Sequence, residues 1–218
     1  MANKQEVPLL PEADAVLPTL ADIHEVRRLG RRDSAFRTAD QTAAALFWHC
    51  APVSLWAEAA GMVLGQAGDA DNLTRGLALI SRALSQVPGV MAAQGARRPT
   101  PRPIEFIRGT APSRLAAISI EPAWEPLVTS KHDAGYPSIS CLRTGTVAGL
   151  LRAIMGGDGS AISLINTELG LTRSFANLTS MLQEVEDAKV WAGTHLRPVA
   201  VESTELGLRL GASIVREA

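Results

Sequence analysis

The loop that precedes Cys141 contains two hydroxyl side chains, Ser138 and Ser140, at the point where a helix is predicted to begin. A serine can cap a helix, and the free N–H groups of the first helical turn favour an anion nearby. The chain also has one local cluster of basic residues, formed by Arg97, Arg98, Arg102 and Arg108. These hydroxyl and guanidinium groups are the first candidates for contact with an anion.

Two further polar residues, Lys189 and His195, stand out near the end of the chain. Lys189 falls on the apolar face of a predicted helix, which indicates either a polar cavity or a side chain that extends to solvent. His195 follows Gly193, where a helix can end, so a histidine that interacts with the helix dipole, or one that faces solvent, is an alternative to a functional one. Arg102 has an alternative as well, because it can brace its segment against Glu105.

The elements that position these residues are predicted to be helices. Hydrophobic residues make up 46% of the 218 residues but aromatic residues only 4%, so Ala, Leu, Ile and Val must fill the core. Such a composition favours packed helices over sheets. We therefore expect an all-α fold, with an irregular arm at 1–18 and a single helical-bundle domain at 19–218. A segment at 95–137, which holds seven of the thirteen prolines, is expected to cross that domain.

Apolar periodicity places the individual helices. The predicted helices are 19–32, 40–64 with an interruption at Pro52, 72–92, 140–155, 160–171, 175–192 and 202–218. Asp40 and Asn72 are expected to cap the second and third of these. The apolar helices 43–64 and 72–92 also make a homodimer plausible.

Charge and cysteine content exclude several classes of protein. Lys and Arg number 21 against 22 Asp and Glu, which gives no bulk electrostatic case for nucleic acid or an anionic membrane. The N-terminus lacks the pattern of a signal peptide, and the longest uncharged run, 41–57, is too short to span a bilayer. Cys50 and Cys141 match neither a disulfide framework nor a metal site and are expected to be buried thiols. A cytoplasmic protein without metal or cofactor is the expectation.

Four blocks of sequence, in order, resemble the vanadium-dependent haloperoxidases and the related type 2 phosphatidic acid phosphatases. The blocks are Glu25–Trp48, Arg102–Leu127, Tyr136–Ser138 and Thr172–His195, and together they cover nearly the whole chain. The resemblance implies a helical bundle with a site for vanadate or phosphate. In that family the site is built from a lysine, two arginines, a Ser-Gly pair at a helix start, and two histidines.

Three of the site positions keep the family's residue. Arg102 falls on the first arginine, Ser138 on the serine, and His195 on the histidine that binds the metal or attacks phosphorus. Lys189 falls on the second arginine, so that the charge is kept while the forked geometry of a guanidinium is lost.

The other positions depart from the family. Gly95, seven residues before Arg102, stands for the lysine, and Arg97 or Arg98 can replace that charge only from another position. Ile139 stands for the glycine and Ser140 for the acid-base histidine, and a serine cannot donate a proton near neutral pH as imidazole does. Val199 replaces an acidic residue that could orient His195.

These departures predict that haloperoxidase or phosphatase activity has been lost. The leading hypothesis is a cofactor-independent enzyme that cyclises, rearranges or isomerises a hydrophobic small molecule. This hypothesis assigns catalytic roles to His195, Arg102, Lys189 and Ser140, and contacts with the substrate to Ser138, Ile139, Tyr136 and Trp191. Two alternatives remain: a non-catalytic binding or assembly protein, and residual vanadium or phosphatase chemistry.

Overall fold

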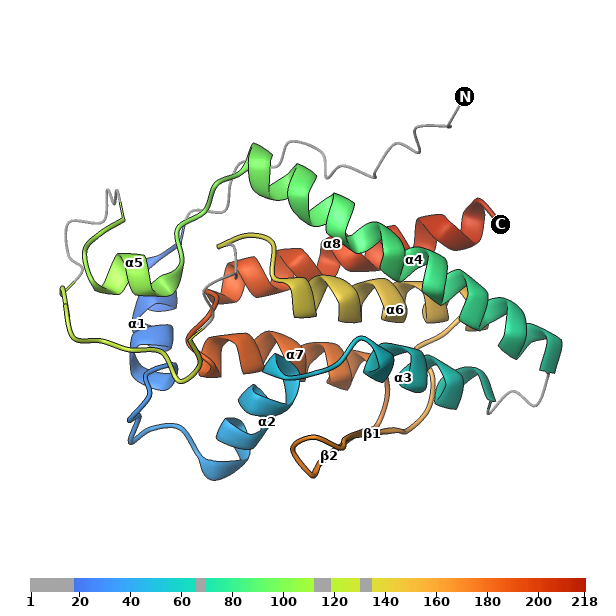
Figure 1. The fold of residues 1–218 in the computed structure, drawn as a ribbon, viewed down its shortest axis with the longest axis horizontal. Helices are drawn as coiled ribbons and strands as arrows, with labels where there is room; N and C mark the ends of the chain where they lie inside the picture. Colours follow the sequence, from blue (N-terminus) through green and yellow to red (C-terminus); the bar gives the residue numbers. More distant parts are fainter. Residues whose placement is uncertain (1–17, 66–69, 112–118, 130–134) are drawn as a thin grey trace.

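The computed structural model describes residues 18–65, 70–111, 119–129 and 135–218, and these residues are mostly helical (Figure 1). The elements are α1 (Leu20–Leu29), α2 (Ala39–His49), α3 (Ser54–Gly65), α4 (Ala70–Arg97), α5 (Pro103–Ile107), α6 (Ile139–Met155), β1 (Ile162–Asn166), β2 (Leu171–Phe175), α7 (Leu178–Trp191) and α8 (Arg197–Arg216). The predicted class, a helical bundle, is confirmed. The predicted arm at 1–18 lies outside the described residues except for its last position.

Helices α6 and α8 form the centre of the bundle and run side by side (Figure 1). Their backbones approach closely because glycines occupy the contact. A Cβ on Gly145 would overlap the carbonyl oxygen of Thr204, and a Cβ on Gly211 would overlap that of Thr146. Every residue of α6 from Ser140 to Leu151 is buried except Arg143, so α6 is a core helix with almost no solvent face.

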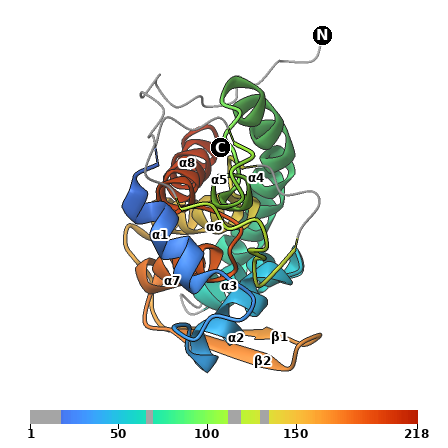
Figure 2. The same cartoon turned by 90° about the vertical axis from the view of Figure 1, so that its left-hand side faces the viewer.

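The other helices pack around this pair. Helix α7 contacts α6 and α8 and carries α2 on its outer side, while α3 and α4 pack together against α6. Helices α1 and α5 lie at one end of the bundle, where Figure 2 shows α1 crossing near α7. A separate cluster of buried apolar residues at this end includes Val26, Trp124, Tyr136 and Leu196. Helix α1 buries Ile23 and Val26 and exposes its polar side, as predicted for an amphipathic helix at 19–32.

A short antiparallel hairpin replaces the helix predicted at 160–171, which was wrong. Along β1 the residues Ile162, Leu164 and Asn166 are buried and the residues between them are exposed, which is the period of two of a strand that lies on a core. Ile162 pairs with Phe175 at the open end of the hairpin, away from the turn. The following helix, predicted from residue 175, begins at Leu178.

The start of α2 differs from the prediction for a local reason. Thr38, not Asp40, is the capping residue, because its hydroxyl oxygen accepts a 3.1 Å hydrogen bond from the N–H group of Gln41. The Asp40 carboxylate instead lies 2.5 Å from the Arg173 guanidinium. Thr38 thus caps the helix locally, whereas Asp40 makes a long-range ion pair with the hairpin.

Three other expectations also changed. Helix α4 begins at Ala70, so Asn72 lies inside the helix and does not cap it. Cys141 is buried as predicted, whereas Cys50 is exposed after the end of α2. Within the described ranges, none of the helices combines the length and the apolar character that crossing a bilayer requires.

Candidate functional site

Lys189 and Ser140, two of the predicted catalytic residues, meet at one carbonyl group. The ammonium of Lys189 donates to the carbonyl oxygen of Trp48 at 3.4 Å, and the hydroxyl of Ser140 donates to the same oxygen at 3.3 Å. Both side chains are buried. The lysine therefore neither extends to solvent nor projects into an open cavity, and the two residues come together on the end of α2.

The sequence explains why this carbonyl needs donors from elsewhere. Trp48 is in the last turn of α2, where backbone carbonyls lack a partner within the helix. Four residues later comes Pro52, which has no N–H group to donate. The negative end of the helix dipole also favours a cation at this position. Lys189 and Ser140 thus satisfy a buried carbonyl that the chain itself cannot satisfy.

Ser138 occupies the N-cap position of α6, but its side chain makes no capping hydrogen bond. Its backbone N–H donates to the hydroxyl of Ser203 at 2.8 Å, while its own Oγ makes no capping bond. Ser138 is fully buried, and its Oγ lies beside the Cys141 thiol without a hydrogen bond to any described nitrogen or oxygen atom. Ser138 therefore holds the predicted N-cap position without the predicted capping bond, and its hydroxyl is a buried polar group that calls for an explanation.

His195 is buried directly after the end of α7. Gly193 has a φ of 76°, which lets the chain turn sharply there, and the N–H of His195 donates to the carbonyl oxygen of Lys189 at 3.3 Å. Its Nδ1 lies 3.1 Å from Oγ1 of Thr194. The alternative of a solvent-facing histidine is excluded, because only 2% of His195 is exposed.

Arg102 lies at the start of α5, with its Nε 3.6 Å from the Glu105 carboxylate. The bracing alternative is thus present in the structure. Arg102 also lines a small hollow of about 50 Å³ together with Ile104, Pro126, Val128, Thr129, Gly193 and Thr194. Pockets for organic ligands usually measure ~300–1,000 Å³, so this hollow has room for water or a compact ion only.

Arg98, a possible replacement for the missing lysine, is committed elsewhere. Its Nη1 lies 2.5 Å from Oε2 of Glu202, and its guanidinium stacks over the Tyr136 ring at 4.7 Å from the centroid. Gly95 adds no charge, and a Cβ there would lie 3.2 Å from the carbonyl oxygen of Tyr136. The described residues thus place no ammonium where the resemblance expects one.

The predicted substrate-contact residues mostly belong to the packing of the bundle. Tyr136 is buried in the apolar cluster at the α1 end, and Ile139 packs against the cluster formed with α4, which contains Val90. Trp191 is partly buried against the main core, and its carbonyl oxygen accepts from Arg37 at 3.4 Å. The structure therefore does not gather these side chains around one cavity.

An ion-pair network contacts the indole of Trp48, and the sequence did not reveal it. Glu184 on α7 binds Arg173 of β2 and accepts from the indole Nε1 of Trp48 at 2.9 Å. Arg173 also binds Asp40 of α2, and these two bonds raise the pKa of its guanidinium, Glu184 first. Trp48 and Glu184 both fall in the blocks that carry the family resemblance, but their contact is not visible in the sequence.

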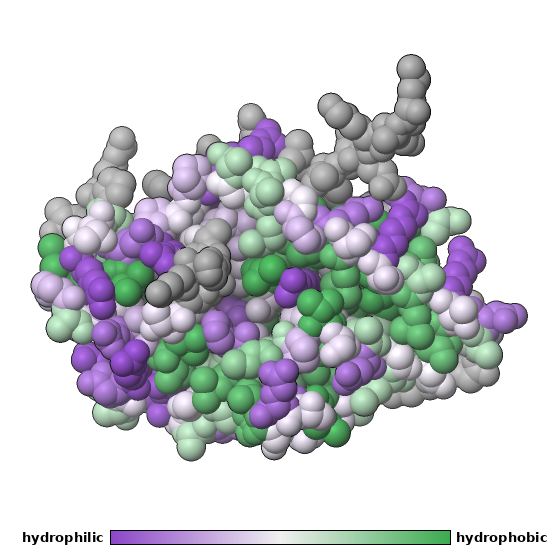
Figure 3. Space-filling model, viewed as in Figure 1, coloured by the Kyte–Doolittle hydropathy of each residue, from purple (hydrophilic) through white to green (hydrophobic). Residues whose placement is uncertain are grey.

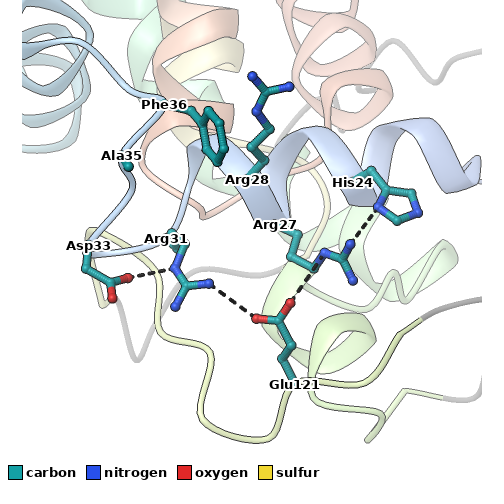
Figure 4. A pocket seen from close by; sticks show the side chains of 8 residues that line it. All are labelled: His24, Arg27, Arg28, Arg31, Asp33, Ala35, Phe36 and Glu121. Carbon is teal, nitrogen blue, oxygen red and sulfur yellow. Dashed lines mark hydrogen bonds and ion pairs between the residues drawn. The ribbon is translucent and has the colours of Figure 1, made fainter.

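A larger hollow of about 560 Å³ lies on α1 (Figure 4). It is lined by His24, Arg27, Arg28, Arg31, Asp33, Ala35, Phe36 and Glu121. Arg27 and Arg31 both lie near Glu121, at 3.5 and 3.4 Å, and Arg28 stacks over Phe36. These three arginines already have partners, and the ion pairs of Arg27 and Arg31 with Glu121 join α1 to the segment that follows α5. No group of three or more metal-binding side chains occurs in the described part of the chain.

Comparisons with known proteins place the fold. No protein-family model matches the chain, and no curated protein does either. A solved bacterial vanadium-dependent iodoperoxidase matches with a TM-score of 0.75 and 19% identity over 97% of this chain and 52% of its own. A bacterial vanadium-dependent chloroperoxidase, in its holo and apo forms, matches with a TM-score of 0.67 at 13% and 14% identity, over 90% of this chain.

The chain spans about half of the length of these solved structures, 52%, 47% and 48%. At such identities the likeness concerns the fold and says nothing about activity. This structural likeness agrees with the resemblance found in the sequence blocks. The chain therefore has the fold of the vanadium-dependent haloperoxidases.

Proposed function

We propose that this haloperoxidase fold has lost the vanadate and phosphate chemistry and that the chain acts as a non-catalytic binding protein. One observation carries the proposal: Lys189 and Ser140 both donate to the carbonyl oxygen of Trp48. Two side chains at positions that serve the anion in the family are thus used to satisfy the backbone.

The remaining charges do not fit a multiply charged oxyanion. Such an ion needs several rigid cations that face it. Arg102 lies beside the carboxylate of Glu105, and Arg98 pairs with Glu202. Because Gly95 contributes no charge, the excess of positive charge that a vanadate site needs is missing from these residues.

Isothermal titration of the full chain with vanadate and with phosphate tests this proposal. We expect no saturable binding in the submillimolar range and no bromide or iodide oxidation with hydrogen peroxide. His195→Ala and Arg102→Gln serve as matched variants. Submillimolar binding that either variant abolishes would falsify the proposal.

A second candidate is cofactor-independent catalysis of a cyclisation, rearrangement or isomerisation on a hydrophobic small molecule. The fully buried Ser138 hydroxyl favours it, because a buried hydroxyl without a nitrogen or oxygen partner costs about 1–3 kcal/mol. A bound substrate could accept that hydrogen bond. Crystals soaked with apolar carbonyl fragments should then show a fragment on Ser138, and soaks that leave this region packed and empty would contradict the candidate.

A further inference from the structure

A groove of about 560 Å³ lies between α3 and α4, with α6 at its base. It is lined by Val53, Ser54, Ala57, Leu77, Ile80, Ser81, Leu84, Ser85 and Arg143. Its volume is that of a small-molecule site, and most of its wall is aliphatic with a few hydroxyl groups. Figure 3 shows apolar surface where α4 passes over α3. Two of the residues that line the groove, Val53 and Leu77, are exposed by 49% and 37%.

Arg143 is the one charged residue that lines this groove. It is also the one residue between Ser140 and Leu151 of α6 that is not fully buried. Its guanidinium carbon lies 5.5 Å from the centroid of the Trp56 ring, and burial lowers the pKa of the guanidinium. Among the described residues, no carboxylate or carbonyl oxygen binds it.

Other partly buried arginines of the chain do have partners. Arg37 donates to backbone carbonyl oxygens, Arg173 binds Glu184 and Asp40, and Arg197 binds Glu25 and Asp187. A partly buried cation without such a partner is costly in free energy. An anion that enters the groove would remove this cost.

We propose that the groove binds a single-chain fatty carboxylate, with the carboxylate on Arg143 and the alkyl chain along Leu77, Ile80 and Leu84. A planar guanidinium can hold a carboxylate by two parallel hydrogen bonds, and the aliphatic wall removes the chain from water. This inference rests on the proposed function, because it names the ligand class of a binding protein. It concerns a different set of residues from Arg102, Ser138, Lys189 and His195.

The test is calorimetric titration of the full chain with dodecanoate below its micellar concentration, compared with dodecanol and with acetate. We expect dodecanoate to bind at least about tenfold more tightly than dodecanol, and acetate not to bind measurably. Arg143→Gln should lower dodecanoate affinity to the level of dodecanol. Arg75→Gln, an exposed cation of α4 outside the lining, makes the same charge change and should have no effect.

Leu77→Ser supplies a second variant on the exposed groove wall and should weaken both ligands, with circular dichroism to confirm folding. The inference is overturned if dodecanoate does not bind, or if Arg143→Gln binds it as well as the parent. It is also overturned if light scattering shows a homodimer that Leu77→Ser dissociates, because the groove would then belong to a second copy. Vanadate binding would contradict the proposed function but leave this result untouched.

Discussion

At the scale of residues, the carbonyl group of Trp48 explains why Lys189 and Ser140 lie together in the core. Pro52 removes the N–H that would have served it, and Lys189 and Ser140 take its place. The sequence predicted that Lys189 would be unusual, since a lysine on an apolar face needs a reason. It could not predict the reason, because the acceptor is a backbone atom 141 positions away.

Removing both donors should cost more than the sum of the single losses. In Lys189→Met or Ser140→Ala the carbonyl keeps one donor, whereas in the double variant both of these bonds are lost and the buried oxygen is left unsatisfied. We expect a coupling free energy of about 1–2 kcal/mol, measured by urea unfolding of the four proteins. If the free-energy losses of the two single variants simply add up to that of the double variant, the two hydrogen bonds act independently and the expected coupling is absent.

Cys141 predicts a loss of stability at alkaline pH. Burial raises the pKa of its thiol from 9.0 to about 11. Between these values the unfolded chain releases a proton that the folded protein keeps, so the free energy of unfolding falls as pH rises. Over this window the loss should be roughly 2–3 kcal/mol. Denaturant titrations of the parent and of Cys141→Ala from pH 8.5 to 11 should differ by this slope, and equal slopes would contradict the assignment.

At the scale of elements, the sequence predicted helices well where the apolar period was long and clear. The helices at 140–155 and 175–192 correspond to α6 and α7 within a few residues. The hairpin was missed because residues 160–171 form a short amphipathic run in which both periods find apolar residues. The strand is identified by the burial of Ile162, Leu164 and Asn166, which alternate with exposed residues. Burial depends on tertiary packing, so the sequence alone does not reveal this pattern.

The contact between α6 and α8 depends on its glycines. Gly211→Ala should destabilise the protein by about 3–5 kcal/mol, because the new methyl group overlaps the backbone of Thr146. Gly89→Ala is the matched control: this residue is also helical, and its Cβ would meet no atom within 4 Å. Since alanine favours helix, the control should be neutral or gain up to ~1 kcal/mol. Thermal unfolding measures both, and equal effects would refute the close packing.

At the scale of the whole molecule, the apolar interior is divided among separate clusters. The main core joins residues of α2, α3, α4, α6, α7, α8 and the hairpin, whereas a smaller cluster lies under α1 and α5. The sequence predicted one helical bundle with a core of Ala, Leu, Ile and Val. The site was less predictable, because Arg102 and His195 are placed by the crossing segment and a turn, whose paths have no periodic signature.

This division predicts unequal local stability. Amide hydrogens in α6 should exchange with solvent only when the whole bundle opens, since almost every residue of the helix is buried. Amides of α1, where only Ile23 and Val26 are buried, should exchange at least about 100-fold faster. Hydrogen-exchange mass spectrometry of the native protein can compare the two helices. Equal protection would show that both clusters open together.

The two cysteines also allow the opening of the core to be timed without any introduced label. Cys50 is at the surface, so a thiol reagent should modify it within the mixing time, whereas Cys141 is enclosed between α6 and α7. The second modification can proceed only as fast as these helices separate. At a reagent concentration high enough to trap each opening, its rate equals the opening rate of the core, and a ligand that binds only the folded state should lower that rate in proportion to its occupancy.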